Sequence, residues 1–247
     1  MPPTPILWSF RRCPYAMRAR LAIQSAGVQC ELREILLKDK PPAFLATSNS
    51  GTVPALKAET TIDESRDIMI WALQQNDPDG WLDMPSAGYD LITENDGPFK
   101  AALDHTKYAV RHPDKNEAEE RAKASIFLHK LNNQLTQRYL FKDTASLADM
   151  AILPFVRQFA NTDRAWFDAQ DWPNLIRWLD TFLTSNAFKG RFSGLSAKSA
   201  AKFYGEFFFS SSFKYRDAAF LSTFNRLTTN SIFEYACSKS SSTNSFL

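Results

Sequence analysis

The stretch Cys13-Pro14-Tyr15-Ala16 decides the fold of this chain. The apolar run at residues 6–10 precedes it and has the length and character of a buried strand. Residues 17–24 follow it and are typical of a helix. Pro14 suits the first turn of that helix, because the N–H group that proline lacks would have no partner there. The sequence therefore predicts a strand that leads through Cys13 directly into a helix.

Cys13 itself is the first candidate for chemistry. At the N-terminus of a helix, unpaired N–H groups and the positive end of the macrodipole stabilise a thiolate. Arg11 and Arg12 would add positive charge beside the sulfur. We therefore expect a reactive thiol whose pKa lies below the free value of about 8.5. The alternative is an inert cysteine that packs at the junction of strand and helix.

The overall composition is that of an ordinary globular protein. The chain has 247 residues, 44% hydrophobic and 23% charged, which is enough for one large or two small domains. A net charge of +2 gives no indication of a nucleic-acid partner. Three scattered cysteines suit a reducing compartment better than a disulfide framework. Without a secretory signal or a long apolar run, we expect a cytoplasmic protein with no membrane partner.

Three regions differ in their pattern along the chain. Residues 1–77 alternate strands with helices, which predicts a small sheet covered by helices; strands are expected at 29–37, 55–58 and 60–63, and a helix at 64–75. After a Pro- and Gly-containing linker, residues 86–189 are helical throughout. Helices are expected there at 89–111, 115–139, 146–161 and 173–185.

The third region, residues 190–247, is an atypical tail rich in phenylalanine and serine. Its composition differs sharply from the rest, because the last 57 residues contain 10 of the chain's 20 phenylalanines. No helical or strand period organises it. The tail is an additional element, a partner-binding segment or a sequence not selected for folding, and the sequence does not separate these three. Cys237, within the tail, has no assigned role.

Two further motifs could hold a ligand. In Gly51-Thr52-Val53-Pro54-Ala55 a proline precedes a short strand, and a cis bond there would expose the Val53 backbone to a peptide-like ligand. An ordinary trans turn is the alternative. At the start of the next helix, Ser65 could hold a ligand carboxylate and Glu64 an ammonium group, or both could cap the helix. Lys38 and Lys40 alone would be solvated loop charges.

Other candidate residues are less specific. Four residues of the predicted helix at 89–111 either form an apolar substrate site facing Cys13 or belong to the core of the helical bundle; they are Tyr89, Phe99, Leu103 and Tyr108. The three histidines have no spacing typical of metal ligands, so we expect no metal site.

Together these motifs resemble the cytosolic glutathione transferase family over residues 5–189. The matching stretches are 9–16, 37–41, 51–56 and 63–68. The resemblance implies a thioredoxin-like α/β N-terminal domain that binds glutathione, followed by an all-α C-terminal domain. In the second domain, Ser146-Leu147-Ala148-Asp149 resembles the family's capping box, in which Asp149 would accept the Ser146 backbone N–H.

The Cys-Pro-aromatic-Ala motif resembles the cysteine-type, omega-like class of that family. This resemblance implies a thiol transferase or reductase in which Cys13 is the nucleophile and forms a mixed disulfide with glutathione, the co-substrate. It implies that Lys40 and the Val53 backbone hold the glutathione peptide, and that Tyr15 flanks the sulfur. The complete set of residues that it assigns to glutathione is Tyr15, Lys40, Val53, Pro54 (as a cis proline), Glu64 and Ser65.

The motif also limits the mechanism. Ala16 stands where the second cysteine of a dithiol motif would be, so a second glutathione must supply the resolving thiol. Cys30, on a predicted strand, is expected to be a core residue. Two alternatives stay open, namely conjugation of glutathione to electrophilic small molecules and a non-catalytic binding role. The resemblance further implies a homodimer that acts on a small-molecule or disulfide substrate.

Overall fold

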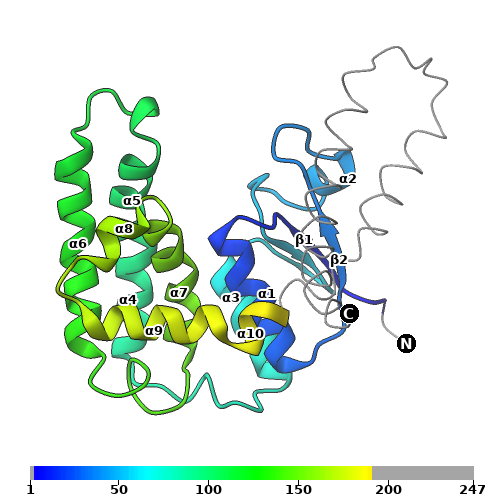
Figure 1. Ribbon diagram of the computed structural model, residues 1–247. Helices are drawn as coiled ribbons and strands as arrows, with labels where there is room; N and C mark the ends of the chain where they lie inside the picture. Colours follow the sequence, from blue (N-terminus) through cyan, green and yellow to red (C-terminus); the bar gives the residue numbers. More distant parts are fainter. Residues whose placement is uncertain (1–2, 191–247) are drawn as a thin grey trace, which may run out of the picture. The chain divides into compact units, whose positions relative to one another are not determined.

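The computed structural model describes residues 3–190 of the chain. These residues fall within one compact unit, in which a small sheet with its covering helices comes first and a set of helices follows (Figure 1). The predicted fold class, a thioredoxin-like α/β part followed by an all-α part, is confirmed. The domain bounds at 1–77 and 86–189 stay a prediction.

Four short strands form the sheet in the order β2-β1-β3-β4. The central strand β1 (Ile6–Ser9) pairs in parallel with β2 (Glu31–Glu34) and antiparallel with β3 (Ala55–Lys57), and β4 (Thr61–Ile62) pairs antiparallel with β3. All four were predicted, but β2 is much shorter than the expected strand at 29–37. It ends early because the chain turns back on itself after it, at the isolated bridge between residues 36 and 39.

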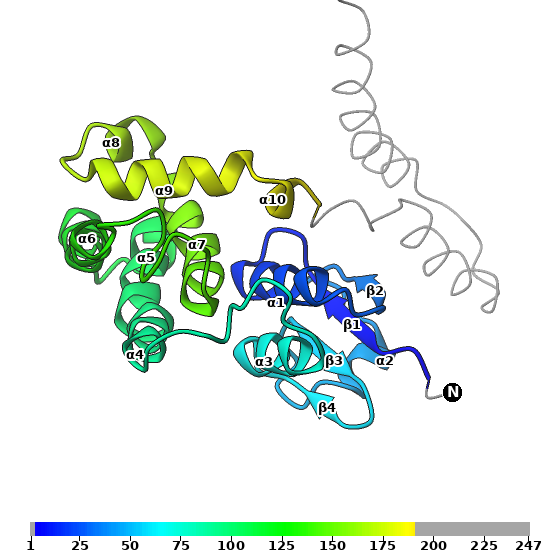
Figure 2. The same cartoon turned by 90° about the horizontal axis from the view of Figure 1, so that it is seen from below.

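Helices α1 (Pro14–Ala26) and α3 (Ser65–Gln75) pack against each other on one face of this sheet (Figures 1 and 2). As predicted, α1 has Pro14 in its first turn. Its C-cap is Gly27, whose φ of +66° is a left-handed conformation that glycine adopts without steric cost. The short helix α2 (Pro42–Leu45), on the opposite side of the strands in Figure 2, was not predicted.

The helical part is more interrupted than the sequence suggests. Its elements are α4 (Ala87–Glu94), the π-helical segment η1 (Asn95–Phe99), α5 (Lys100–Lys107), the 3-10 turn η2 (Ala109–Arg111), α6 (Glu117–Gln134), α7 (Leu147–Ala160), α8 (Arg164–Asp168), α9 (Pro173–Thr184) and α10 (Asn186–Gly190). The predicted helix at 89–111 therefore contains a π-helical segment. Pro98 lies within it and has no N–H group for the regular α-helical hydrogen bond.

The predicted helix at 115–139 ends five residues early, at Gln134. The following loop is held by side-chain hydrogen bonds rather than by helical ones, since the Gln134 Nε2 donates to the Leu140 carbonyl and the Leu140 N–H donates to the Asp149 carboxylate. Local sequence preference does not report such contacts. Helices α8 and α10, each of five residues, were likewise not predicted.

Helix α7 connects the two parts of the fold. It is buried along almost its whole length and packs against α1, α4 and α9. Its Phe155 meets Tyr15 of α1 edge to face, with ring centroids 4.7 Å apart. The sheet part and the helical part therefore meet immediately beside Cys13.

The predicted tail from residue 191 onwards, including Cys237, lies outside the described residues. Gly190, which was assigned to the tail, is the last residue of α10. Within residues 3–190, every helix is too short or too polar to serve as a membrane-spanning segment.

Candidate functional site

Cys13 occupies the position that the sequence predicts. It is the N-cap residue of α1, with an extended backbone (φ −74°, ψ 123°), and follows closely on the end of β1. No side chain caps this helix end. The backbone N–H groups of Tyr15 and Ala16 instead favour the thiolate form of Cys13 and lower the pKa of its thiol. The start of α1 thus directs its free donors at a thiol.

The electrostatics of this thiol correct one expectation. Burial raises the pKa of Cys13 above its ordinary value, and the N–H groups of the helix start oppose this shift without cancelling it. The predicted depression of the pKa is therefore wrong for the ligand-free protein, because the sequence reveals the helix start but not the depth of the sulfur. The cations that favour the thiolate are Arg20 and Lys100, whereas the predicted Arg11 and Arg12 are exposed.

The sulfur faces the backbone that leads into β3. The Val53–Pro54 peptide bond is cis, which confirms the expectation drawn from the resemblance. The Cys13 thiol donates to the Val53 carbonyl oxygen over 3.6 Å. Within residues 3–190 the Val53 N–H has no hydrogen-bond partner. This N–H and the neighbouring carbonyl can together pair with one peptide group of a ligand.

Two side chains hold the loop in front of this backbone. The Lys40 ammonium group donates to the Gly51 carbonyl over 2.8 Å, and the Asp63 carboxylate accepts the Asn49 N–H over 2.9 Å. Gly51 has a φ of +62°, which a side chain would strain. Lys38 and Lys40 are both exposed, but Lys40 is tied by its hydrogen bond to the loop that leads into Val53 and is therefore not merely a solvated loop charge.

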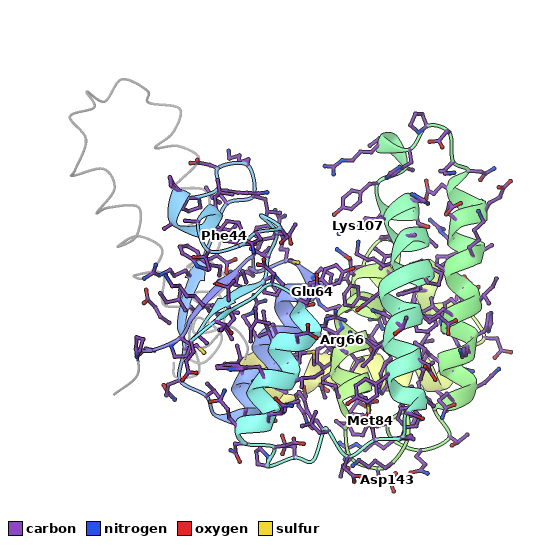
Figure 3. All side chains as sticks on the ribbon, turned by 180° about the vertical axis from the view of Figure 1, so that it is seen from behind. Phe44, Glu64, Arg66, Met84, Lys107 and Asp143 are labelled. Atoms are coloured by element: carbon purple, nitrogen blue, oxygen red, sulfur yellow. The ribbon has the colours of Figure 1, made fainter. Side chains whose placement is uncertain are left out.

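Glu64 and Ser65 begin α3 but face different surroundings. Glu64 is exposed, and its side chain makes no capping hydrogen bond to the helix. Figure 3 shows it on the side of the sheet part that faces the helical part. Ser65 is 3% exposed, and its hydroxyl accepts a hydrogen bond from Arg18 Nε over 3.0 Å. The Ser65 hydroxyl keeps its own proton, which it can donate to a carboxylate.

Arg18 is a residue of this site that the sequence interpretation missed. Its guanidinium group is buried and forms two hydrogen bonds of 2.8 Å with Asp96, a residue of the π-helical segment η1. It also lies over the rings of Tyr15 and Phe155, at 5.1 and 5.3 Å from their centroids. The available signal was an arginine on the face of α1 that its apolar residues predict to be buried.

Tyr15 lies where the two parts of the fold meet. Burial raises the pKa of Tyr15 to about 12, and the negative charge of Asp96 contributes in the same direction. The phenol is therefore a neutral hydrogen-bond donor at physiological pH. The ammonium group of Lys100 lies 5.8 Å from the centre of the same ring. Lys100, from the helical part, was not among the predicted residues.

The four candidates for an apolar substrate site separate in the structure. Phe99 and Leu103 are buried core residues, and the Phe99 ring lies 5.0 Å from that of Phe127. Tyr89 is exposed on α4, and Tyr108 is half-buried at the end of α5. The core alternative is therefore correct for Phe99 and Leu103.

Cys30 and the histidines, the remaining candidates, make contacts that are typical of structural residues. Cys30 is half-buried, and burial raises the pKa of this thiol to about 11. His105 pairs with Glu120 at 2.9 Å, and the His129 ring packs against Trp172. In the described part of the chain, no group of three or more His, Cys, Asp or Glu side chains could hold a metal ion.

The capping box at the start of α7 is confirmed. Asp149 accepts the Ser146 N–H over 2.8 Å, as predicted, and also the Ser146 hydroxyl. Its other carboxylate oxygen accepts the Leu140 N–H over 3.0 Å and the Trp178 indole N–H over 2.9 Å. These two additional partners lie outside the motif, in the loop before α7 and on α9, and the motif does not predict them.

Comparison with known proteins identifies the family. The description "Glutathione S-transferase, N-terminal domain" matches residues 7–80, and "Glutathione S-transferase, C-terminal domain" matches residues 119–181. Together the two matches cover more than half of the chain. Glutathione S-transferase omega-2 of Mus musculus is 36% identical over 62 residues, which are 23% of this chain and 25% of that protein. The match thus spans only a quarter of that relative's length.

Solved structures agree with this fold. Glutathione transferase F7 from Populus trichocarpa has a TM-score of 0.65 at 19% identity, covering 78% of this chain and all of its own. A Pseudomonas fluorescens member of the glutathione transferase family, solved with two glutathione bound, has a TM-score of 0.66 at 16% identity, covering 76% of this chain and 92% of its own. At these identities the structures establish the fold alone. By its two domain matches, the chain belongs to the glutathione S-transferase family.

Proposed function

We propose that this protein is a glutathione-dependent thiol transferase or reductase whose nucleophile is Cys13. The observation that carries the proposal is the position of the sulfur, which belongs to the N-cap residue of α1 and lies 3.6 Å from the Val53 carbonyl oxygen. A tyrosine or serine hydroxyl in this place could only stabilise the thiolate of glutathione. A cysteine sulfur can also form a disulfide with it.

The surrounding residues suit the three parts of glutathione. The central peptide group would pair with the free N–H and the carbonyl of Val53, as an added strand does. Lys40, beside the same loop, would hold the peptide from the other side. At the γ-glutamyl end, the Ser65 hydroxyl would donate to the carboxylate, and the exposed Glu64 would pair with the ammonium group.

Binding would also activate the thiol. In the free protein, the Val53 carbonyl accepts the Cys13 proton and so supports the neutral thiol, in addition to the effect of burial. A glutathione N–H bound to that carbonyl would compete for this acceptor. Because the helix N–H groups and Lys100 favour the thiolate, the pKa of Cys13 would then fall. The raised pKa of the free protein is therefore compatible with a thiolate that forms on binding.

The reaction has two balanced exchange steps. The Cys13 thiolate attacks the glutathione sulfur of a mixed disulfide, the disulfide bond breaks, and the other thiolate leaves and takes up a proton. A second glutathione, as its thiolate, attacks the glutathione sulfur bound to Cys13, releasing oxidised glutathione and the Cys13 thiolate. One disulfide is reduced and one is formed. Position 16 is alanine, so no thiol of this motif can replace the second glutathione.

The test is turnover of glutathionylated mercaptoethanol with reduced glutathione, measured for the wild type and for Cys13→Ser. The proposal expects turnover in the wild type and none in the variant. Absence of turnover in the wild type, despite glutathione binding, would contradict the proposal and leave a binding role. The homodimer implied by the resemblance stays a prediction and can be checked by sedimentation of the same samples.

One observation favours conjugation of glutathione to electrophiles as a second candidate. Because burial raises the pKa of Cys13, its neutral thiol could donate a hydrogen bond to the glutathione thiolate without forming a disulfide. Cys13→Ala distinguishes the two functions, with 1-chloro-2,4-dinitrobenzene as the electrophile. Loss of disulfide exchange supports the thiol transferase, whereas retained or enhanced conjugation without any exchange in the wild type supports the second candidate.

A further inference from the structure

Two cations flank an aromatic ring at the C-terminal end of α5. The Lys107 ammonium group lies 5.1 Å from the centre of the Tyr108 ring, and the Arg111 guanidinium carbon lies 4.7 Å from it. Both cations are exposed, and Tyr108 is half-buried. The group combines an apolar ring surface with two positive charges that remain accessible to a ligand.

Within residues 3–190, neither cation has an acidic partner. Asp104, one turn before Tyr108 on the same helix, is paired with Lys100. Lys107 and Arg111 form no ion pair in the described part of the chain, and their contacts there are those with the Tyr108 ring. Their charge is thus uncompensated by this part of the protein.

The helix places this group on the side of the reactive sulfur. Lys100, at the start of α5, acts on Cys13 and lies 5.8 Å from the Tyr15 ring. Lys107 follows seven residues later, which is two helical turns and about 10 Å along the same face. Figure 3 shows Lys107 on the side of α5 that faces the sheet part, where Glu64 is labelled.

We propose that Lys107, Tyr108 and Arg111 bind a carboxylate-bearing second substrate. This inference rests on the proposed thiol exchange and names the class of disulfide that it reduces, in which the half bound to glutathione is an apolar chain ending in a carboxylate. The chain would lie on the Tyr108 ring, and the planar guanidinium group of Arg111 would donate two parallel hydrogen bonds to the carboxylate oxygens. Glutathione would remain at Val53 and Glu64.

Three matched substrates test the proposal. They are the mixed disulfides of glutathione with 6-mercaptohexanoate, 6-mercaptohexanol and 6-aminohexanethiol, which differ only in the terminal group. For the wild type we expect kcat/KM to be about five- to tenfold higher for the carboxylate than for the alcohol, the effect of two partly solvated ion pairs, and lowest for the amine. Added salt should reduce this preference.

The decisive variant is Lys107→Gln/Arg111→Gln, in which the ratio between the carboxylate and the alcohol should fall to about one. The matched control is Lys130→Gln/Arg138→Gln, which also removes one lysine and one arginine charge. Lys130 pairs with Glu94, and the Arg138 guanidinium carbon lies 5.7 Å from the centre of the Tyr139 ring. The control should keep the wild-type ratio. Equal kcat/KM for all three substrates in the wild type, or an unchanged ratio in the first variant, would overturn the proposal.

A binding measurement separates this inference from the proposed function. Calorimetry with Cys13→Ser, which cannot exchange disulfides, should show tighter binding of the hexanoate adduct than of the hexanol adduct. The difference should disappear when Lys107→Gln/Arg111→Gln is added. If no mixed disulfide is turned over by the wild type, the thiol transferase is refuted, and equal binding of the two adducts would independently refute the anion site.

Discussion

Helices α1 and α7 pack against each other but begin in opposite ways. At the start of α7 the buried carboxylate of Asp149 accepts hydrogen bonds from two groups of Ser146 and two groups from elsewhere in the fold. At the start of α1 no side chain caps the helix, and the N–H groups meet the sulfur of Cys13. One helix start is thus closed by the protein and stabilises the fold. The other is left open at Cys13, the proposed nucleophile.

The largest effect should come from removing that nucleophile. Cys13→Ser should lower kcat/KM for disulfide exchange about a thousandfold or more, because no other group can form the intermediate. The free energy of unfolding should change by less than about 1 kcal/mol, since the open end contributes little stability. Turnover and urea denaturation measure the two quantities.

Cys30→Ser is the matched control, because this thiol is also half-buried but has no helix start beside it. Its exchange activity should stay within about twofold of the wild type, the scale of a neutral substitution. A comparable loss of activity in both variants would break the contrast between the two cysteines.

Substitution at the closed start of α7 should instead reduce stability strongly and activity only slightly. Asp149→Ala should lower the free energy of unfolding by about 3–5 kcal/mol, because it leaves several buried donors without an acceptor. Asp149→Asn, which keeps one acceptor oxygen, should cost less. Urea denaturation measures both, and exchange activity per folded molecule should remain within a few-fold. A loss below about 1 kcal/mol for Asp149→Ala would contradict this account of the capping box.

Those two helix starts also show what the sequence could predict. Pro14 after Cys13, and Ser146 three residues before Asp149, are local signals, and both helices begin where these signals place them. The cis bond before Pro54 followed from the resemblance and is present. Local motifs therefore located both helix starts and the turn before β3, and they placed Cys13, the proposed nucleophile, at the N-cap of α1.

The features of the site that the sequence did not predict all depend on tertiary contacts. The pKa of Cys13 depends on burial and on Lys100, which is 87 positions further along the chain. The burial of Ser65 against Arg18, and the pairing of Arg18 with Asp96, likewise depend on helices brought together by folding. Neither distance nor depth is encoded in a short motif, so these features required the structure.

Arg18, on α1 beside its open end, allows a test of whether the contacts that stabilise the fold also orient Ser65 for glutathione. Arg18→Lys keeps the charge but loses the paired hydrogen bonds to Asp96 and the contact with Ser65. We expect a loss of about 2 kcal/mol in unfolding free energy. The KM for glutathione should rise about tenfold because Ser65 is no longer oriented.

Arg66→Lys is the control for that substitution, because Arg66 follows Ser65 in the first turn of α3 but is partly exposed and has only a loose ion pair with Asp67 at 3.8 Å. It should alter neither quantity measurably. If Arg18→Lys changed stability but left the KM for glutathione at the wild-type value, Ser65 would have no part in glutathione binding.

The smallest effect concerns the electrostatics of the open end. Lys100→Met removes a positive charge that favours the thiolate, so the pKa of Cys13 should rise further and its alkylation at pH 8 should slow. The expected factor is about two to three, typical of a partly solvated charge. Arg12→Met is the control, because that side chain is exposed and should leave the rate unchanged. If both substitutions slowed alkylation equally, the rate would depend on the overall surface charge and not specifically on Lys100.

The central claim is that Cys13 forms a disulfide with glutathione, and peptide mapping by mass spectrometry after treatment with oxidised glutathione tests it most directly. The account predicts a glutathionyl group on Cys13, none on Cys30, and its removal when reduced glutathione is added. An unmodified Cys13 under conditions in which glutathione binds would contradict the account.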